Sequence, residues 1–191
     1  MSIKETLQSM GEVDLKSKVI VPLMRALGCP YVKDHHGPDE NGKDVIYEFV
    51  NIYRDKSYGA IIIKNSGNLG KSQIENVERQ AREAVKEFLA PKTTTQTIVH
   101  ELTIMTSFDV TENLRDYMYK ESGIKDFHNL HIVDGDRLQG LIISQITEYN
   151  KLNSTQQPYL FDPETFLGMC ESKIQSPIQN TDSGASVLTE V

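Results

Sequence analysis

The sequence predicts an α/β sandwich around a central mixed sheet, and two patterns carry that prediction. Short apolar segments typical of strands alternate with longer segments whose apolar residues recur every three or four positions, as in amphipathic helices. Two strand segments follow one another directly, whereas each later strand is preceded by a helix, an order that gives a mixed sheet. With 191 residues, the chain is long enough for one domain with a full hydrophobic core.

Residues 13–27 predict the first long helix. Pro22 predicts a kink because it removes one backbone hydrogen bond, and Gly28 predicts the end of the helix. The preceding residues 2–10 are weakly helical, and the polar residues 29–43 predict a loop. The buried stripe of the long helix recurs at every fourth position: Leu15, Val19, Leu23 and Leu27.

A hairpin and a second helix follow. Strands are expected at 44–50 and 59–64, joined by a polar turn. The helix begins after Ser72 and ends at Pro91. Its apolar stripe comprises Ile74, Val77, Ala81, Ala84, Val85 and Phe88.

The second half alternates strands and helices. A strand is expected over 97–106, then a helix with Thr111 as its N-cap. Another strand over 130–133 leads through a turn into a helix that carries Leu138.

These elements predict a domain over residues 1–150, followed by two appendages. Residues 151–174 form an accessory C-terminal segment, with a helix over 163–173 that begins at Asp162 and Pro163. Residues 175–191 are rich in small polar side chains and predict a disordered tail.

Composition narrows the classes of function. No apolar run approaches the roughly 20 residues of a transmembrane helix, so no membrane partner is expected. The two cysteines lack metal-ligand spacing, and a reducing cytoplasm is the expected compartment. The net charge of −7 argues against indiscriminate binding of nucleic acid. Any contact with DNA therefore requires a placed basic patch, a partner or a divalent cation.

Two charged residues mark the predicted hairpin. Asp44 stands at the start of the first strand and Lys64 at the end of the second, where interior strands are normally apolar. An aspartate can hold a hydrated Mg²⁺. A nearby lysine can orient an attacking water or stabilise charge on a phosphate. The simpler alternative is an ion pair that fixes the register of the hairpin.

The order of these motifs resembles the PD-(D/E)XK nuclease superfamily, and more closely the Mrr-type catalytic domain of type IV restriction endonucleases. The hairpin contributes Gly42-Lys43-Asp44 and Ile62-Ile63-Lys64, which are followed by a glycine-containing loop and a helix with a glutamine. The later strand ending in Thr106-Ser107 and the turn Asp134-Gly135-Asp136 are also similar to that family. The resemblance implies a restriction-endonuclease-like three-layer sandwich with a central mixed β-sheet.

The resemblance also implies a function: metal-dependent hydrolysis of DNA phosphodiester bonds, in prokaryotic defence. Asp44 would bind Mg²⁺ together with the backbone carbonyl of Ile63, and Lys64 would be the catalytic lysine. Gln80, in the following helix, would face the site. DNA is the implied partner, and a homodimer is implied because nucleases of this fold often cut the two strands as dimers.

One residue departs from the family pattern. Ile62 occupies the position where the family has Glu, Asp or sometimes Gln, so one metal ligand is missing. Glu48 shares a strand face with Asp44 but lies roughly 13 Å along the strand, too far to share an ion. Other acids remain open as replacements: Glu40 in the approach loop, and Glu12 or Asp14 at the start of the first long helix.

The loop after Lys64 and the acidic charge of the chain bear on two further interpretations. The segment Gly67–Ser72 echoes a phosphate loop but lacks its spacing, which excludes a nucleoside triphosphatase. Lys71 is nevertheless expected to contact a DNA phosphate, because the loop leads into a helix N-terminus. The competing hypothesis is a catalytically degenerate nuclease fold that acts as a DNA- or protein-binding module, which the acidic net charge and Ile62 both favour.

Overall fold

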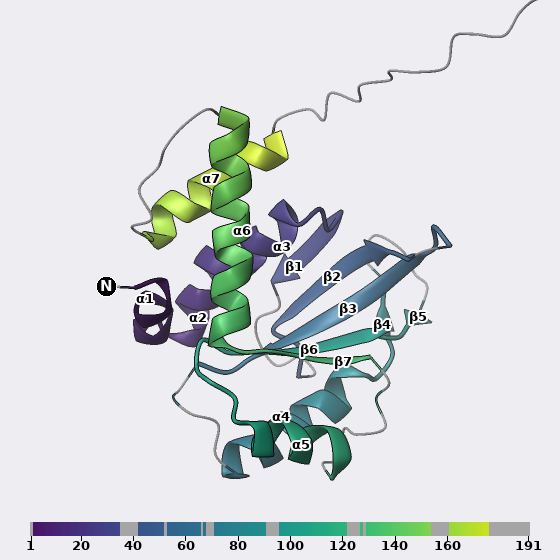
Figure 1. Cartoon of the computed structure of the whole chain (residues 1–191). Helices are drawn as coiled ribbons and strands as arrows, with labels where there is room; N and C mark the ends of the chain where they lie inside the picture. Colours follow the sequence, from purple (N-terminus) through teal and green to yellow (C-terminus); the bar gives the residue numbers. More distant parts are fainter. Residues whose placement is uncertain are drawn as a thin grey trace, which may run out of the picture.

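The chain folds as an α/β sandwich around a five-stranded mixed sheet (Figure 1). The computed structural model describes residues 2–34, 42–51, 53–65, 67, 71–90, 96–121, 127, 129–153 and 161–175. The strand order is β1-β2-β3-β6-β7, with β1, β2 and β3 antiparallel and β3, β6 and β7 parallel. The strands are β1 (Tyr31–Asp34), β2 (Val45–Val50), β3 (Lys56–Ile63), β6 (Glu101–Met105) and β7 (Leu130–Val133). The predicted mixed sheet is confirmed.

Helices cover both faces of the sheet (Figure 1). One face packs against α1 (Ile3–Ser9), α2 (Glu12–Leu15), a π-helical turn η1 (Lys16–Ile20), α3 (Val21–Ala26), α6 (Gly135–Asn153) and α7 (Pro163–Gln175). The other face packs against α4 (Lys71–Ala84) and α5 (Glu112–Lys120).

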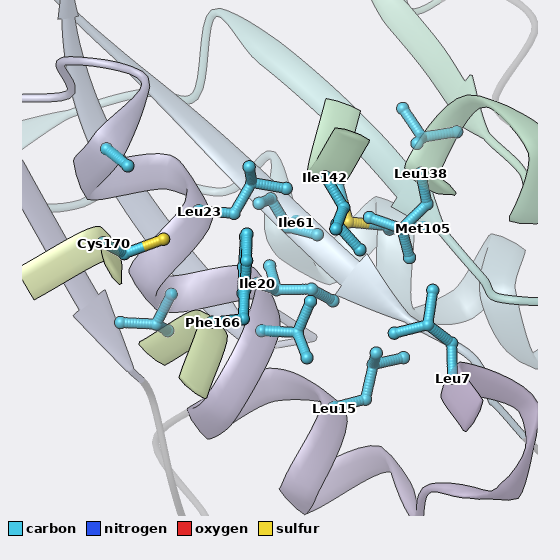
Figure 2. Packing of buried hydrophobic residues seen from close by; sticks show 14 of the residues in the cluster. Leu7, Leu15, Ile20, Leu23, Ile61, Met105, Leu138, Ile142, Phe166 and Cys170 are labelled. Carbon is cyan, nitrogen blue, oxygen red and sulfur yellow. The ribbon is translucent and has the colours of Figure 1, made fainter. Parts of the chain in front are cut away.

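The side chains of β3 alternate between these two cores, as expected for a strand covered on both faces. Ile61 and Ile63 belong to the core under α1–α3 and α6, which Figure 2 shows around Ile61, Leu23 and Ile142. Ile62 belongs to the core under α4 and α5.

The first long helix contains a π-helical turn before Pro22. The N–H of Val21 donates to the carbonyl of Lys16, five residues back, in place of the usual four. Pro22 has no N–H to continue the regular ladder, so the wider turn and the proline occur together. Gly28 ends the helix with φ +91°, a backbone conformation that favours glycine, and the predicted stop is confirmed.

Several boundaries differ from the sequence prediction. Strand β3 begins at Lys56, within the predicted turn, and not at residue 59. Strand β1 lies within the predicted loop 29–43, because a short edge strand with a mixed pattern gives little apolar signal. The predicted strand 97–106 is divided between β6 and β5 (Gln96–Thr97). Helix α4 ends before Phe88, which lies in β4 (Phe88–Leu89) and contacts Tyr58 edge-on.

Helix α7 is part of the larger core. Asp162 caps it by accepting from the N–H of Thr165 at 2.8 Å, as predicted from its sequence. Phe166 and Cys170 are buried, and Figure 2 shows both against the α3 side of the core. The predicted tail lies outside the described residues beyond Gln175, the last residue of α7. Within the described ranges, no helix has the length and apolar character needed to cross a membrane.

Candidate functional site

Asp44 and Lys64 lie at one end of the β2–β3 hairpin. Asp44 directly precedes β2 and Lys64 directly follows β3. Oδ2 of Asp44 accepts a hydrogen bond from the N–H of Ile63 at 2.6 Å, which turns the carboxylate toward the end of β3. In an extended strand the N–H and C=O of one residue point to the same side. The carbonyl of Ile63 therefore faces the side on which Asp44 lies.

Glu12 reaches the same end of the sheet from the helical layer. It is the first residue of α2, and its Oε2 lies 3.9 Å from Nζ of Lys64. Its Oε1 accepts from the N–H of Asn65 at 3.0 Å. The Lys64 side chain is 12% exposed and that of Glu12 is 40% exposed. The lysine is thus enclosed, while the carboxylate beside it remains open to solvent.

The pKa of the Asp44 carboxyl lies above its usual range. Burial is the largest cause, and the negative charge of Glu12 adds to it. The N–H of Ile63 and the positive charges of Lys64 and Lys16 act in the opposite direction. Burial therefore outweighs the local cations, and a further cation at this position would favour the ionised carboxylate.

Lys16 adds a second buried lysine near Asp44. It is the first residue of the π-helical turn and lies four positions after Glu12. Its Nζ is 2.9 Å from Oδ1 of Asp34 at the end of β1. The charge of Lys16 lowers the pKa of Asp44, so the π turn and β1 both contribute to the electrostatics of this end of the sheet.

Asn65 connects the elements that meet at the site. Its Nδ2 donates to the carbonyls of Leu7 at 3.0 Å and Met10 at 2.7 Å. Its Oδ1 accepts from the N–H of Ser107 at 3.1 Å and from the hydroxyl of the same serine. The buried carboxamide thereby joins the end of α1, the end of β3 and the segment that follows β6.

Gln80 lies beside the chain segment that leads to Asp44. Gly42 has φ +76°, and a Cβ atom there would lie 2.2 Å from the backbone oxygen of Gln80, so only glycine fits against α4. Oε1 of Gln80 is shielded from solvent and accepts no hydrogen bond from the described residues. This contact places the backbone of Gln80 against the segment before Asp44. That its side chain faces the site, and its catalytic role, stay predictions.

Ile62 is fully buried in the core under α4 and α5. Its neighbours in that cluster are apolar, among them Ala81 and Ile104. An acidic side chain at this position would need a different local arrangement to reach Asp44.

The other candidate acids lie elsewhere. Glu48 pairs with Lys56 at 3.1 Å, toward the opposite end of the hairpin. Asp14 lies 3.6 Å from Lys18 on an exposed helix face. Glu40 lies outside the described residues. Lys71 begins α4, and its side chain also lies outside them.

The oxygen donors at the site fit a magnesium ion better than a softer metal. The carboxylates of Asp44 and Glu12 and the carbonyl of Ile63 are hard ligands, and Mg²⁺ binds through one or two carboxylates while keeping several waters. Across the part of the chain that the structure describes, no group of three or more His, Cys, Asp or Glu side chains is arranged to hold a metal. The two carboxylates and one carbonyl could therefore supply only part of the coordination of such an ion.

Comparisons with known proteins add no relative. The chain matches no protein-family model, no curated protein and no solved structure.

Sequence reasoning named Asp44, Lys64 and, among several alternatives, Glu12. It missed Asn65 and Lys16. A weak signal for Lys16 was present, because it follows Glu12 by four residues and such residues share a helix face. Nothing in the sequence around Asn65 indicates that its carboxamide bonds to segments near residues 10 and 107.

Proposed function

We propose that this chain is a metal-dependent DNA nuclease with a restriction-endonuclease-like fold of the Mrr type. The observation that carries the proposal is the position of Glu12 beside Lys64, at the end of the sheet that also holds Asp44. In this proposal Glu12 of α2 supplies the second carboxylate, which the apolar side chain of Ile62 cannot provide. The sheet order, with an antiparallel hairpin continued by parallel β6 and β7, supports the fold assignment.

Asp44, Glu12 and the Ile63 carbonyl would hold Mg²⁺. When bound, the ion would neutralise phosphate charge and make an attached water more acidic. Asp44 would contribute an ionised carboxylate whose charge the ion compensates, because burial disfavours that charge in the protein alone. The Ile63 N–H holds the carboxylate in its orientation through the hydrogen bond to Oδ2.

Lys64 would act on the reacting groups directly. Its ammonium is enclosed at the end of β3 and can donate to a phosphate oxygen or orient the attacking water. To do so it must move from Glu12, and the 3.9 Å separation is already longer than a good charge-assisted hydrogen bond. Gln80 would contribute its unpaired Oε1 as an acceptor for that water.

The negative net charge of the chain is consistent with DNA binding that depends on a divalent cation. A net charge of −7 repels the phosphate backbone at long range, so a divalent ion and Lys64 must provide the local attraction. We further propose that the protein acts in the prokaryotic cytoplasm against foreign DNA. A homodimer would place two such sites on the two strands.

A plasmid-nicking assay with Mg²⁺ or Mn²⁺ tests the proposal. We expect cleavage that stops with a chelator and is lost in Asp44→Ala, Lys64→Ala and Glu12→Gln. Asp14→Asn is the matched control for Glu12→Gln, because Asp14 lies on the same short helix but pairs with Lys18 away from the site. It should cleave like the wild type.

The outcomes of this assay separate the alternatives. Cleavage that persists in both Asp44→Ala and Lys64→Ala would show that the site is elsewhere. Loss in Asp14→Asn equal to that in Glu12→Gln would remove the specific role of Glu12.

A binding module without catalysis is the second candidate. Its supporting observation is that both carboxylates of the site already have partners within the protein. Asp44 accepts from the Ile63 N–H, and Glu12 lies near Lys64 and accepts from the Asn65 N–H. Absence of cleavage, together with no shift of the melting temperature by Mg²⁺ or Mn²⁺, would favour this candidate. DNA binding measured with and without the metal would then be the next assay.

A further inference from the structure

We infer that Asn65 is the positioning residue of this site, and that its buried carboxamide holds Glu12 beside Lys64. The inference rests on the proposed function for its catalytic meaning. The contacts that carry it are independent of that function, because they concern how one short segment of chain is fixed.

The orientation of the Asn65 carboxamide is set by its partners. Two backbone carbonyls, those of Leu7 and Met10, can only accept, so the NH₂ group must face them. The N–H of Ser107 can only donate, so the carboxamide oxygen must face it. With the Ser107 hydroxyl as a second donor, both N–H groups and both lone-pair directions of the carboxamide are used.

The two carbonyls belong to the last turn of α1 and to its C-cap residue, immediately before the junction with α2. Helix α1 ends at Ser9, Met10 is its C-cap residue, and Gly11 is the N-cap residue of α2. Glu12 follows at once as the first residue of α2. Fixing the carbonyls of Leu7 and Met10 therefore fixes the backbone from which the Glu12 side chain extends.

The backbone of Asn65 completes the arrangement. Its N–H donates to Oε1 of Glu12 at 3.0 Å, while Oε2 of the same carboxylate faces Lys64 at 3.9 Å. One residue thus holds the junction through its side chain and the carboxylate through its main chain. Because Asn65 directly follows Lys64, the positions of Glu12 and Lys64 are both fixed relative to the end of β3.

Ser107 supports the carboxamide from the opposite side. It is fully buried, and its carbonyl accepts from Nε2 of Gln8 on α1 at 3.2 Å. Ser107→Ala removes only the hydroxyl contact and leaves the N–H donor to Asn65 in place. It is therefore a milder variant than Asn65→Asp, which replaces the two N–H donors by an oxygen facing two carbonyls.

Amide hydrogen exchange tests the inference without reference to activity. The Asn65 N–H is held by the Glu12 carboxylate, whereas the neighbouring Lys64 N–H is held by the Met105 carbonyl within the sheet. In Ser107→Ala and Asn65→Asp we expect residue 65 to lose roughly 10-fold more protection than Lys64, the factor for one charge-assisted hydrogen bond. Glu12→Ala gives the reference for full loss of that acceptor.

A general structural role predicts a different pattern. If the variants only destabilise the fold, the amides of residues 64 and 65 lose protection equally, and that result would overturn the inference. Gln145→Ala is the matched control, because it removes another buried carboxamide. Gln145 lies on α6, away from the hairpin, and accepts from Nζ of Lys173 on α7 at 2.9 Å. It should leave the ratio between the two amides unchanged.

Binding of Mn²⁺ supplies the functional arm. With a wild type that binds Mn²⁺, Ser107→Ala should weaken its affinity by about 10-fold or more, as loss of a residue supporting a metal ligand typically does. Unchanged affinity in both Ser107→Ala and Asn65→Asp would overturn the positioning role. A wild type that neither binds Mn²⁺ nor cleaves DNA would defeat the proposed function alone, and the exchange ratio would still decide whether Asn65 holds Glu12.

Discussion

The two ends of the β2–β3 hairpin each bring a lysine near a glutamate, yet the two pairs differ in every other respect. Toward the hairpin turn, Glu48 is 9% exposed and its partner Lys56 is 70% exposed, 3.1 Å apart. At the other end the order is reversed, because Lys64 is enclosed and Glu12 is the more open of the two. A buried acid with a flexible surface lysine is an ordinary structural pair.

The difference in charge balance is more informative than the difference in exposure. Glu48 is matched by Lys56 and also accepts from the hydroxyl of Tyr58 at 3.5 Å. At the other end two lysines, Lys64 and Lys16, lie near three acids, Asp44, Glu12 and Asp34, and the pKa of Asp44 remains raised by burial. One end is balanced and the other has an excess of acid, which is the condition for attracting a cation.

The largest expected effect comes from restoring an acid at position 62. Ile62→Glu would place a carboxylate in the apolar core under α4 and α5, so we expect a loss of more than about 4 kcal/mol in the free energy of unfolding. Val50→Glu, at an exposed position near the turn of the same hairpin, should change it by less than about 0.5 kcal/mol. Urea unfolding measures both.

The two variants also test how the site is built. A stable Ile62→Glu protein with stronger metal binding would mean that the side chain at position 62 can turn toward Asp44. The helix would then not be the source of the second carboxylate.

Ile62 and its surroundings show which features of the fold and the site the sequence predicts and which it does not. The continuous apolar run Ile61–Ile63 predicted a buried strand, and the strand and its neighbours β2 and β6 were found from such local patterns. Glu12 remained one of several alternatives, because its approach to Lys64 depends on how α1 and α2 pack against the end of the sheet. Contacts between segments far apart in the chain leave no periodic signal, and the network of Asn65 is of that kind.

An intermediate effect is expected when each lysine is replaced by methionine. Lys64→Met keeps most of the side-chain volume and removes the charge, and cleavage should fall by about 10²–10³-fold, as for loss of one group that stabilises transition-state charge. Lys56→Met removes the lysine of the balanced pair and should leave the rate within about two-fold, since this exposed lysine lies at the opposite end of the hairpin from the site. Initial nicking rates at a fixed Mg²⁺ concentration provide the measurement, and equal losses in both variants would show that the two ends do not differ in function.

The smallest effect, and the one that separates the two ends by its sign, comes from replacing each acid by its amide. The pKa of Asp44 is raised in the folded state, so the folded protein holds that proton more tightly than the unfolded chain does. Its contribution to stability therefore falls as pH rises from the unfolded value, about 3.9, through the folded value. Asp44→Asn cannot ionise and can still accept from the Ile63 N–H, so it should be more stable than the wild type at pH 7.

That advantage should shrink as the pH is lowered toward about 4, where wild-type Asp44 is also protonated. Glu48→Gln should instead be less stable than the wild type at pH 7, by about 1 kcal/mol or less, because it loses the ion pair with Lys56. Urea unfolding of both variants between pH 4 and pH 7, values spanning roughly the carboxyl range, gives the comparison. If both amides destabilise the protein at pH 7, then the Ile63 N–H and Lys64 outweigh burial at Asp44. The excess of acid that distinguishes this end of the hairpin would then be compensated within the protein, and its charge balance would no longer favour a bound cation.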